Sequence, residues 1–400
     1  MKNQTSSNNP FSISSSSASA YLLALTFLIY SAGLLDIIMH SDGLKIYLDM
    51  SRALILLCFL LLTVKVTPYD SKGLMFCLYA LLCVIIFHDM FILEVATGLL
   101  VAFTINKKNT TTYIKLAIIA TLLVVIPAML LAKMGVINSV VFIAPSTADT
   151  TLTAASKDTF GFWHPNQITL LVAGCLLASF YIGNRKLLIL CILTYAVLLG
   201  STISRTFLPI PILVVLHTIL PTNNKTIRSL LLLGTFGISI LATLISLITS
   251  LPLILKTALS PENYIVADKI LSYRLQIIER YMQELNLFEL VTGWSSIKHE
   301  LDSAYINTIF SQGYLIYLAV TIGLFYIQFI AYKSKMLKEA MAISLFMLIA
   351  NFETPIGASS LIFIVALLSI IRTIKRNEHE TKNRDRAKNK HFAPPTLLYQ

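Results

Sequence analysis

Residues 229–252 have the sequence SLLLLGTFGISILATLISLITSLP, an apolar run without a charged side chain. A helix crosses the hydrocarbon layer of a membrane with about 20 residues, so this run is long enough to span it. The rest of the chain has the same character, since 56% of its 400 residues are hydrophobic and 13% are charged. One soluble core cannot bury so much apolar surface. The sequence therefore predicts helices that face lipid.

Similar runs recur along the chain and predict an all-α polytopic membrane protein with about 12 transmembrane helices. The predicted spans are 20–39, 48–65, 73–87, 90–105, 113–133, 166–182, 187–203, 206–220, 229–252, 304–331, 338–351 and 357–373. The third and fourth are short, so about ten or eleven crossings are an alternative.

The spans divide the chain into five parts. Residues 1–19 are rich in Ser and Asn and are predicted to be a flexible cytoplasmic tail rather than a signal peptide. Helices 1–9 occupy 20–252, and a large extracytoplasmic loop follows at 253–303. Helices 10–12 occupy 304–374, and 375–400 form a basic cytoplasmic tail that can anchor to anionic lipid.

Basic residues predict the orientation, because cytoplasmic segments of membrane proteins are enriched in Lys and Arg. If both termini are cytoplasmic, the inner segments hold 21 of the 31 Lys and Arg, and the short outer segments hold five. The other five lie in the 253–303 loop. Its charges do not indicate orientation, because long loops cross the membrane largely regardless of charge. The inner residues are Lys2, Lys65, Lys72, Lys107, Lys108, Lys115, Arg185, Lys186, Lys225, Arg228, Lys333, Lys335, Lys338 and the eight from Arg372 to Lys390.

Cysteines and common motifs give no indication of a cofactor. Cys58, Cys77, Cys83, Cys175 and Cys191 all fall inside predicted spans, where Cys behaves as a small hydrophobe, so no disulfide is expected. No CxxC, HExxH, Walker or GxGxxG motif occurs. The net charge of +11 is explained by orientation, and no nucleic-acid partner is expected.

The segment 134–167 ends in Phe160-Gly161-Phe162-Trp163-His164-Pro165-Asn166-Gln167, just before a predicted helix. Proline favours the first turn of a helix, so His164-Pro165 indicates a helix start at the outer membrane surface. One interpretation is a capped helix start with interfacial aromatics. The other is that His164, Asn166 and Gln167 bind sugar or diphosphate at that helix end.

Arg205 lies in Gly200-Ser201-Thr202-Ile203-Ser204-Arg205-Thr206, a very short connection between two apolar runs. It must lie at or just inside the membrane boundary, where a charge is costly and needs a partner. It is either an arginine that extends toward water at a turn or a functional group.

The 253–303 loop contains an amphipathic pattern. Apolar residues recur at helical spacing and predict one helix over 269–286 that lies on the membrane or covers the bundle. They are Leu271, Leu275, Ile278, Met282 and Leu285. Arg280 falls opposite this stripe and is expected to be solvated or paired with Glu284, whereas Arg274 lies at its flank and can face the bundle.

The loop ends with Trp294, His299 and Leu301-Asp302-Ser303-Ala304-Tyr305, followed by a helix that contains Gly313. Asp302 can be a first-turn helix charge or an acidic group in a site whose cations are Arg205 and Arg274. Trp294 and Tyr305 can stack on sugar rings, although both also suit a membrane interface.

Taken together, these motifs resemble the O-antigen polymerase and O-antigen ligase superfamily. The resemblance covers residues from about 155 to 320 and consists of G-S-x-x-S-R-T at 200–206, the loop arginine, D-S-x-Y at 302–305 and a Gly-containing helix. The Gly161-Phe162-Trp163-His164-Pro165-Asn166 stretch is more similar to polymerases than to ligases. Where ligases carry His-Asn, this chain has Asp302, with His299 three residues earlier.

The resemblance implies a GT-C-like fold and a metal-independent, inverting glycosyltransferase of the bacterial inner membrane, without a cofactor, acting on the extracytoplasmic face. Its donor would be an undecaprenyl-diphosphate-linked glycan. Arg205 and Arg274 would neutralise the diphosphate, with Asp302 or His299 as base. Arg280 would contact substrate, and a chain-length regulator is a candidate partner.

Three functions remain open from the sequence. A polymerase of surface-polysaccharide repeat units is favoured, an O-antigen ligase is the alternative within this class, and a flippase for lipid-linked oligosaccharide is the alternative from another class. Transporters usually contain internal repeats and charges near the bilayer midplane, and neither is evident here.

Overall fold

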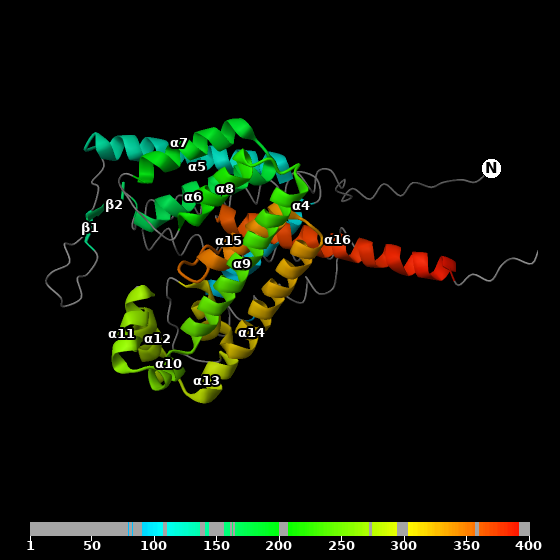
Figure 1. Ribbon diagram of the computed structural model, residues 1–400. Helices are drawn as coiled ribbons and strands as arrows, with labels where there is room; N and C mark the ends of the chain where they lie inside the picture. The colour runs from blue at the N-terminus through cyan, green and yellow to red at the C-terminus, as the bar shows by residue number, and fades with distance from the viewer. Residues whose placement is uncertain are drawn as a thin grey trace, which may run out of the picture.

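A computed structural model describes residues 79, 82, 90–106, 110–136, 141–143, 156–160, 162, 165–199, 207–271, 274–293, 303–356 and 360–391 (Figure 1). Most of these residues are helical. The strands in this part of the chain form one short antiparallel pair, β1 (Val141–Ile143) and β2 (Ser156–Asp158), in the segment before α6 (Pro165–Ile182). The predicted all-α class is therefore confirmed for the described part of the chain.

The predicted spans from the fourth to the twelfth each correspond to one labelled helix, although α14 is interrupted by a kink at Gly313. In chain order the remaining ones are α4 (Met90–Asn106), α5 (Thr110–Lys133), α7 (Arg185–Leu199), α8 (Pro209–Ile219), α9 (Lys225–Ser250), α14 (Ala304–Lys333), α15 (Leu337–Ile349) and α16 (Leu361–His391). The first three predicted spans lie outside the described residues, apart from Tyr79 and Leu82, which are helical.

Three of the described helices are long and apolar enough to cross a membrane, namely α5, α9 and α14, and α6 and α8 contain shorter apolar stretches. Their outer faces carry large apolar side chains that the protein leaves uncovered. Leu123 is 69% exposed, Leu230 62% and Ile219 75%. Exposed large apolar side chains on helices of this composition fit contact with lipid.

The core of the bundle is built around α15 and α6. Helix α15 packs against α9, α14 and α16, while α6 packs against α5, α7, α8 and α16. Almost every side chain of α15 is buried, including Ser344, whose hydroxyl donates to the Met341 carbonyl in its own helix. A helix that is apolar all round belongs inside a bundle, where it fixes the spacing of its neighbours.

The prediction of a single helix over 269–286 is wrong in its extent. The described part of the 253–303 segment, 253–271 and 274–293, contains four short helices at one end of the bundle (Figure 1). They are α10 (Pro252–Ala258), α11 (Pro261–Ile270), α12 (Arg274–Gln283) and α13 (Leu287–Thr292). Local caps cause the breaks. The buried Asp268 accepts hydrogen bonds from the first N–H groups of α12, and Asn286 forms a capping box with Glu289 at the start of α13.

The apolar stripe itself is confirmed. Leu271, Leu275, Ile278, Met282 and Leu285 are all buried, so the stripe faces the protein even though the helix is interrupted. Burial of the stripe attaches α12 to the bundle below it.

The last helix is longer than the predicted span 357–373. Helix α16 continues through the basic tail to His391 and projects away from the bundle (Figure 1). Lys, Arg and Glu are good helix formers, and Arg376 pairs with Glu380 one turn later at 3.0 Å.

Candidate functional site

The connection between α15 and α16, residues 350–356, is where several helix ends meet; we call it the α15–α16 junction. The start of α14 lies against it: the Ala304 N–H donates to the carbonyls of Ala350 (2.9 Å) and Glu353 (3.2 Å). Ser303 Oγ also donates to the Ala350 carbonyl at 3.3 Å, and Asn307 Nδ2 donates to Thr354 Oγ1 at 3.3 Å. These bonds fix the N-terminus of α14 on the junction.

Arg274, the first residue of α12, contacts the same junction. One of its Nη2 hydrogens is donated to the Phe352 carbonyl at 2.6 Å, and the guanidinium carbon lies 5.7 Å from the centre of the Phe352 ring. A guanidinium beside an aromatic ring is held in a defined plane. The sequence prediction that Arg274 faces the bundle is confirmed.

Asn166, in the first turn of α6, also contacts the junction, in addition to α14 and α12. Its Nδ2 donates to Glu353 Oε1 at 2.8 Å. The predicted helix start is confirmed, because α6 begins at Pro165, where the missing N–H costs nothing. Gln167 is half-buried in the same turn.

Glu353 is a residue that the sequence reasoning missed. It is half-buried and belongs to Asn351-Phe352-Glu353-Thr354-Pro355, a polar stretch between two apolar runs. A carboxylate in a short connection between two apolar runs is unusual, and this is the sequence signal that could have identified Glu353. The junction thus brings a guanidinium, a carboxylate and two side-chain amides to one place.

Tyr305 is buried below the junction rather than at its surface. Its side chain is 3% exposed, and its ring packs edge-on against Tyr317 with centroids 6.2 Å apart. In this position it supports the start of α14 and has no open face for a sugar ring. His164, Arg205, Trp294, His299 and Asp302 lie outside the described residues.

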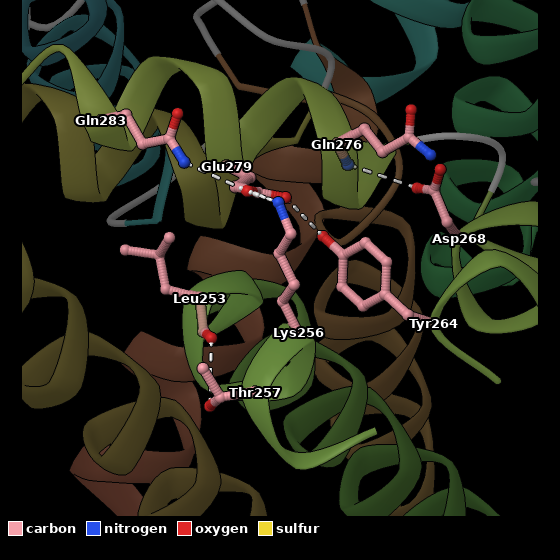
Figure 2. Close-up of polar contacts among 8 residues, drawn as sticks. All are labelled: Leu253, Lys256, Thr257, Tyr264, Asp268, Gln276, Glu279 and Gln283. Atoms are coloured by element: carbon pink, nitrogen blue, oxygen red, sulfur yellow. Dashed lines mark hydrogen bonds and ion pairs between the residues drawn. The ribbon is translucent and has the colours of Figure 1, made fainter. Parts of the chain in front are cut away.

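Arg280 is exposed on α12 and lines a groove of about 680 Å³ between α10, α11 and α12. Figure 2 shows the polar network in its wall, centred on Glu279, whose side chain is 9% exposed. Glu279 accepts from Lys256 Nζ at 2.5 Å, from the Tyr264 hydroxyl at 3.0 Å and from Gln283 Nε2 at 3.1 Å. This network holds the three short helices together.

Asp268, on α11, is fully buried and bonds to the start of α12 separately from this network. Its Oδ1 accepts from the N–H groups of Leu275 (2.9 Å) and Gln276 (3.3 Å), while Oδ2 has no partner among the described residues. Burial raises the pKa of the Asp268 carboxyl, aided by the Glu279 charge and opposed by the two N–H bonds.

This raised pKa predicts a pH-dependent stability. The folded state binds the Asp268 proton more tightly, so the free energy of unfolding falls as pH rises from the ordinary Asp pKa of about 3.9 through the raised value. Asp268→Asn keeps the Oδ1 acceptor and removes the charge. Thermal unfolding in detergent should therefore give a difference in Tm, variant minus native, that grows from acid to neutral pH. A difference independent of pH would contradict this assignment.

No group of three or more potential metal ligands occurs among the described residues. Scans against protein-family models, curated proteins and solved structures found no match.

Proposed function

We propose that this protein is a surface-polysaccharide polymerase of the bacterial inner membrane, a glycosyltransferase that joins undecaprenyl-diphosphate-linked repeat units. The observation that supports it is the meeting of Asn166, Arg274 and Glu353 at the α15–α16 junction. Two of these residues come from segments that the sequence resemblance singled out independently, although they are far apart in the chain.

The chemistry required is a displacement at the anomeric carbon of the donor. A hydroxyl of the acceptor glycan attacks that carbon, the bond to the diphosphate oxygen breaks with its electron pair, and the hydroxyl proton passes to a base. A guanidinium in a water-poor site stabilises the departing diphosphate by bidentate hydrogen bonds. Arg274 would have this role, together with Arg205.

Glu353 joins Asp302 and His299 as a candidate base. Its carboxylate is held by the Asn166 amide at 2.8 Å, which fixes the orientation of one oxygen. A positioned carboxylate accepts a proton from an attacking hydroxyl when the two lie within hydrogen-bond reach. Asn166 is then a positioning residue for the base.

The α10–α12 groove is suited to the glycan part of the substrate. Its wall combines a tyrosine ring, the amides of Gln276 and Gln283, and the cations Lys256 and Arg280. Aromatic faces and amide groups are the side chains that bind hydroxyl-rich rings with defined geometry. Helix α12 contributes to both places: Arg274 at its start contacts the junction, and Gln276, Arg280 and Gln283 line the groove.

The arrangement of charges supports a junction outside the cytosol. The starts of α6, α14 and α16 and the end of α15 meet at the junction. The basic residues lie away from these ends: Lys333 at the end of α14, Lys338 at the start of α15 and Arg376 in the middle of α16. Because basic residues favour the cytoplasmic side, we infer cytoplasmic termini and an extracytoplasmic junction. The GT-C-like arrangement of about 12 spans remains a proposal that rests on the sequence resemblance.

The proposal is tested by analysing the length and the location of the lipid-linked glycans in a strain that lacks this protein. We expect single repeat units to reach the cell surface without polymer, because export is intact and elongation is lost. A complemented strain that regains long chains is the control. Units retained on the cytoplasmic face would instead identify a flippase, and long unattached chains would identify a ligase.

A further inference from the structure

A second pocket, of about 400 Å³, lies at the end of the bundle opposite the junction. It is formed by the ends of α6 and α8, the α8–α9 connection, the starts of α9 and α15, the α14–α15 turn and α16. We call it the basic pocket and define it by Phe180, His217, Arg228, Lys335, Lys338 and Arg376. It shares no residue with the junction or with the α10–α12 groove.

The lining of the basic pocket has a strong excess of positive charge. Arg228, Lys335, Lys338 and Arg376 come from separate elements, and Glu339 is the one carboxylate among the described lining residues. Arg228 Nη2 donates to the Lys335 carbonyl at 2.8 Å, and Lys338 Nζ lies 5.5 Å from the centre of the Phe180 ring. Arg376 is already paired with Glu380 at 3.0 Å, so the excess charge comes from Arg228, Lys335 and Lys338. Cations that line one pocket repel one another, and an anion between them removes that repulsion.

His217 adds a buried acceptor to this pocket. Its side chain is 5% exposed, its ring packs edge-on against Phe180, and its Nδ1 lies 2.8 Å from the Leu213 carbonyl. A carbonyl can only accept, so Nδ1 carries the hydrogen and Nε2 is left as an acceptor. Nε2 is buried and has no hydrogen-bond partner in the part of the chain that the structure describes. A ligand with an O–H group would satisfy it.

The first turn of α15 completes the lining. Met336 precedes the helix without a side-chain cap, and Leu337, Lys338 and Glu339 of the first turn line the pocket. The first N–H groups of a helix have no acceptor within the helix and favour an anion.

We propose that the basic pocket binds a phosphate monoester group. The cations and the first N–H groups of α15 stabilise the negative charge of the phosphate. The P–OH of a monoester monoanion donates a hydrogen bond to His217 Nε2. A phosphate diester lacks that hydrogen. The group can belong to a membrane lipid with a terminal phosphate, such as phosphatidic acid, or to a soluble phosphate compound.

Binding to the purified full-length chain in detergent tests this site with two probes. Native mass spectrometry measures retention of phosphatidic acid against phosphatidylglycerol, and calorimetry measures binding of glycerol 3-phosphate. Lys338→Gln and Arg228→Gln should each weaken binding about tenfold, the effect of losing one charge-assisted hydrogen bond. His217→Phe keeps the contact with Phe180 and should reduce retention of phosphatidic acid to that of phosphatidylglycerol.

Lys333→Gln is the matched control. Lys333 is the last residue of α14, close in sequence to Lys335 and Lys338, but it does not line the pocket. Its binding should equal that of the native protein, and Lys338→Arg should retain most of the affinity. Binding of the lipid alone would identify a membrane source, and binding of glycerol 3-phosphate a soluble one. The site is refuted if neither probe binds, or if Lys333→Gln weakens binding as much as Lys338→Gln.

Discussion

Replacing Arg274 with lysine is expected to abolish polymer synthesis while the protein level in the membrane stays at that of the native chain. The arginine donates to the Phe352 carbonyl at 2.6 Å and lies beside the Phe352 ring. Lysine has a flexible stem and one compact charge, so it cannot hold that carbonyl and also give two parallel bonds to a diphosphate. Loss of such a transition-state contact costs about 3–4 kcal/mol, or roughly 10²–10³-fold in rate.

The measurement is elongation of a lipid-linked repeat unit by membranes that contain each variant, with protein level followed by immunoblot. Arg185→Lys is the control, because Arg185 is exposed at the start of α7 and touches neither site. Thermal unfolding separates the two roles of Arg274. A guanidinium that only holds the junction would lower Tm together with activity. Normal chain length in the Arg274→Lys strain would refute the proposed role outright.

The helices could be predicted because lipid imposes a simple requirement on sequence. A run of about 20 apolar residues can only be a span, and the backbone must then be helical. The predicted span 229–252 corresponds to α9, and 304–331 to α14. The predicted burial of the stripe from Leu271 to Leu285 depended on the same kind of periodicity.

The helix breaks in 253–303 could not be predicted from that periodicity, because the apolar spacing continues across them. Leu271 and Leu285 are buried although neither lies inside a helix. The breaks depend on Asp268 and Asn286, whose capping bonds form with residues only a few positions away. The spacing of Asn286 and Glu289, typical of a capping box, is the local sequence signal of the second break.

Only some residues of the junction could be identified from the sequence, because its members are far apart in the chain. Asn166 and Glu353 are 187 residues apart, and Arg274 and Phe352 are 78 apart. Nothing in local spacing indicates which ends of about 12 helices meet. The sequence could identify Asn166 and Arg274 as unusual, but Glu353 becomes a candidate only after the helices are packed.

Gly313→Ala is expected to prevent stable folding, because two glycines meet backbone to backbone where α13 contacts α14. Gly313 has φ +81° and ψ 169°, a conformation that only glycine adopts readily, and Gly293 has φ +72°. A Cβ on Gly313 would lie within 2.6 Å of the Gly293 nitrogen and the Thr292 carbonyl carbon. Backbone atoms cannot move aside as a side chain can, so strain and overlap together should cost about 3–5 kcal/mol.

Gly323→Ala, ten residues further along α14, is the matched control. No atom lies within 4 Å of the position its Cβ would take, so alanine there should leave stability unchanged or raise it by about 1 kcal/mol. Thermal unfolding in detergent and the yield of membrane-inserted protein measure both variants. The break at Gly313 also sets the direction of residues 304–312, which carry Asn307 to the junction. A Gly313→Ala protein with native Tm and native polymer would show that this close contact fixes neither the fold nor the site.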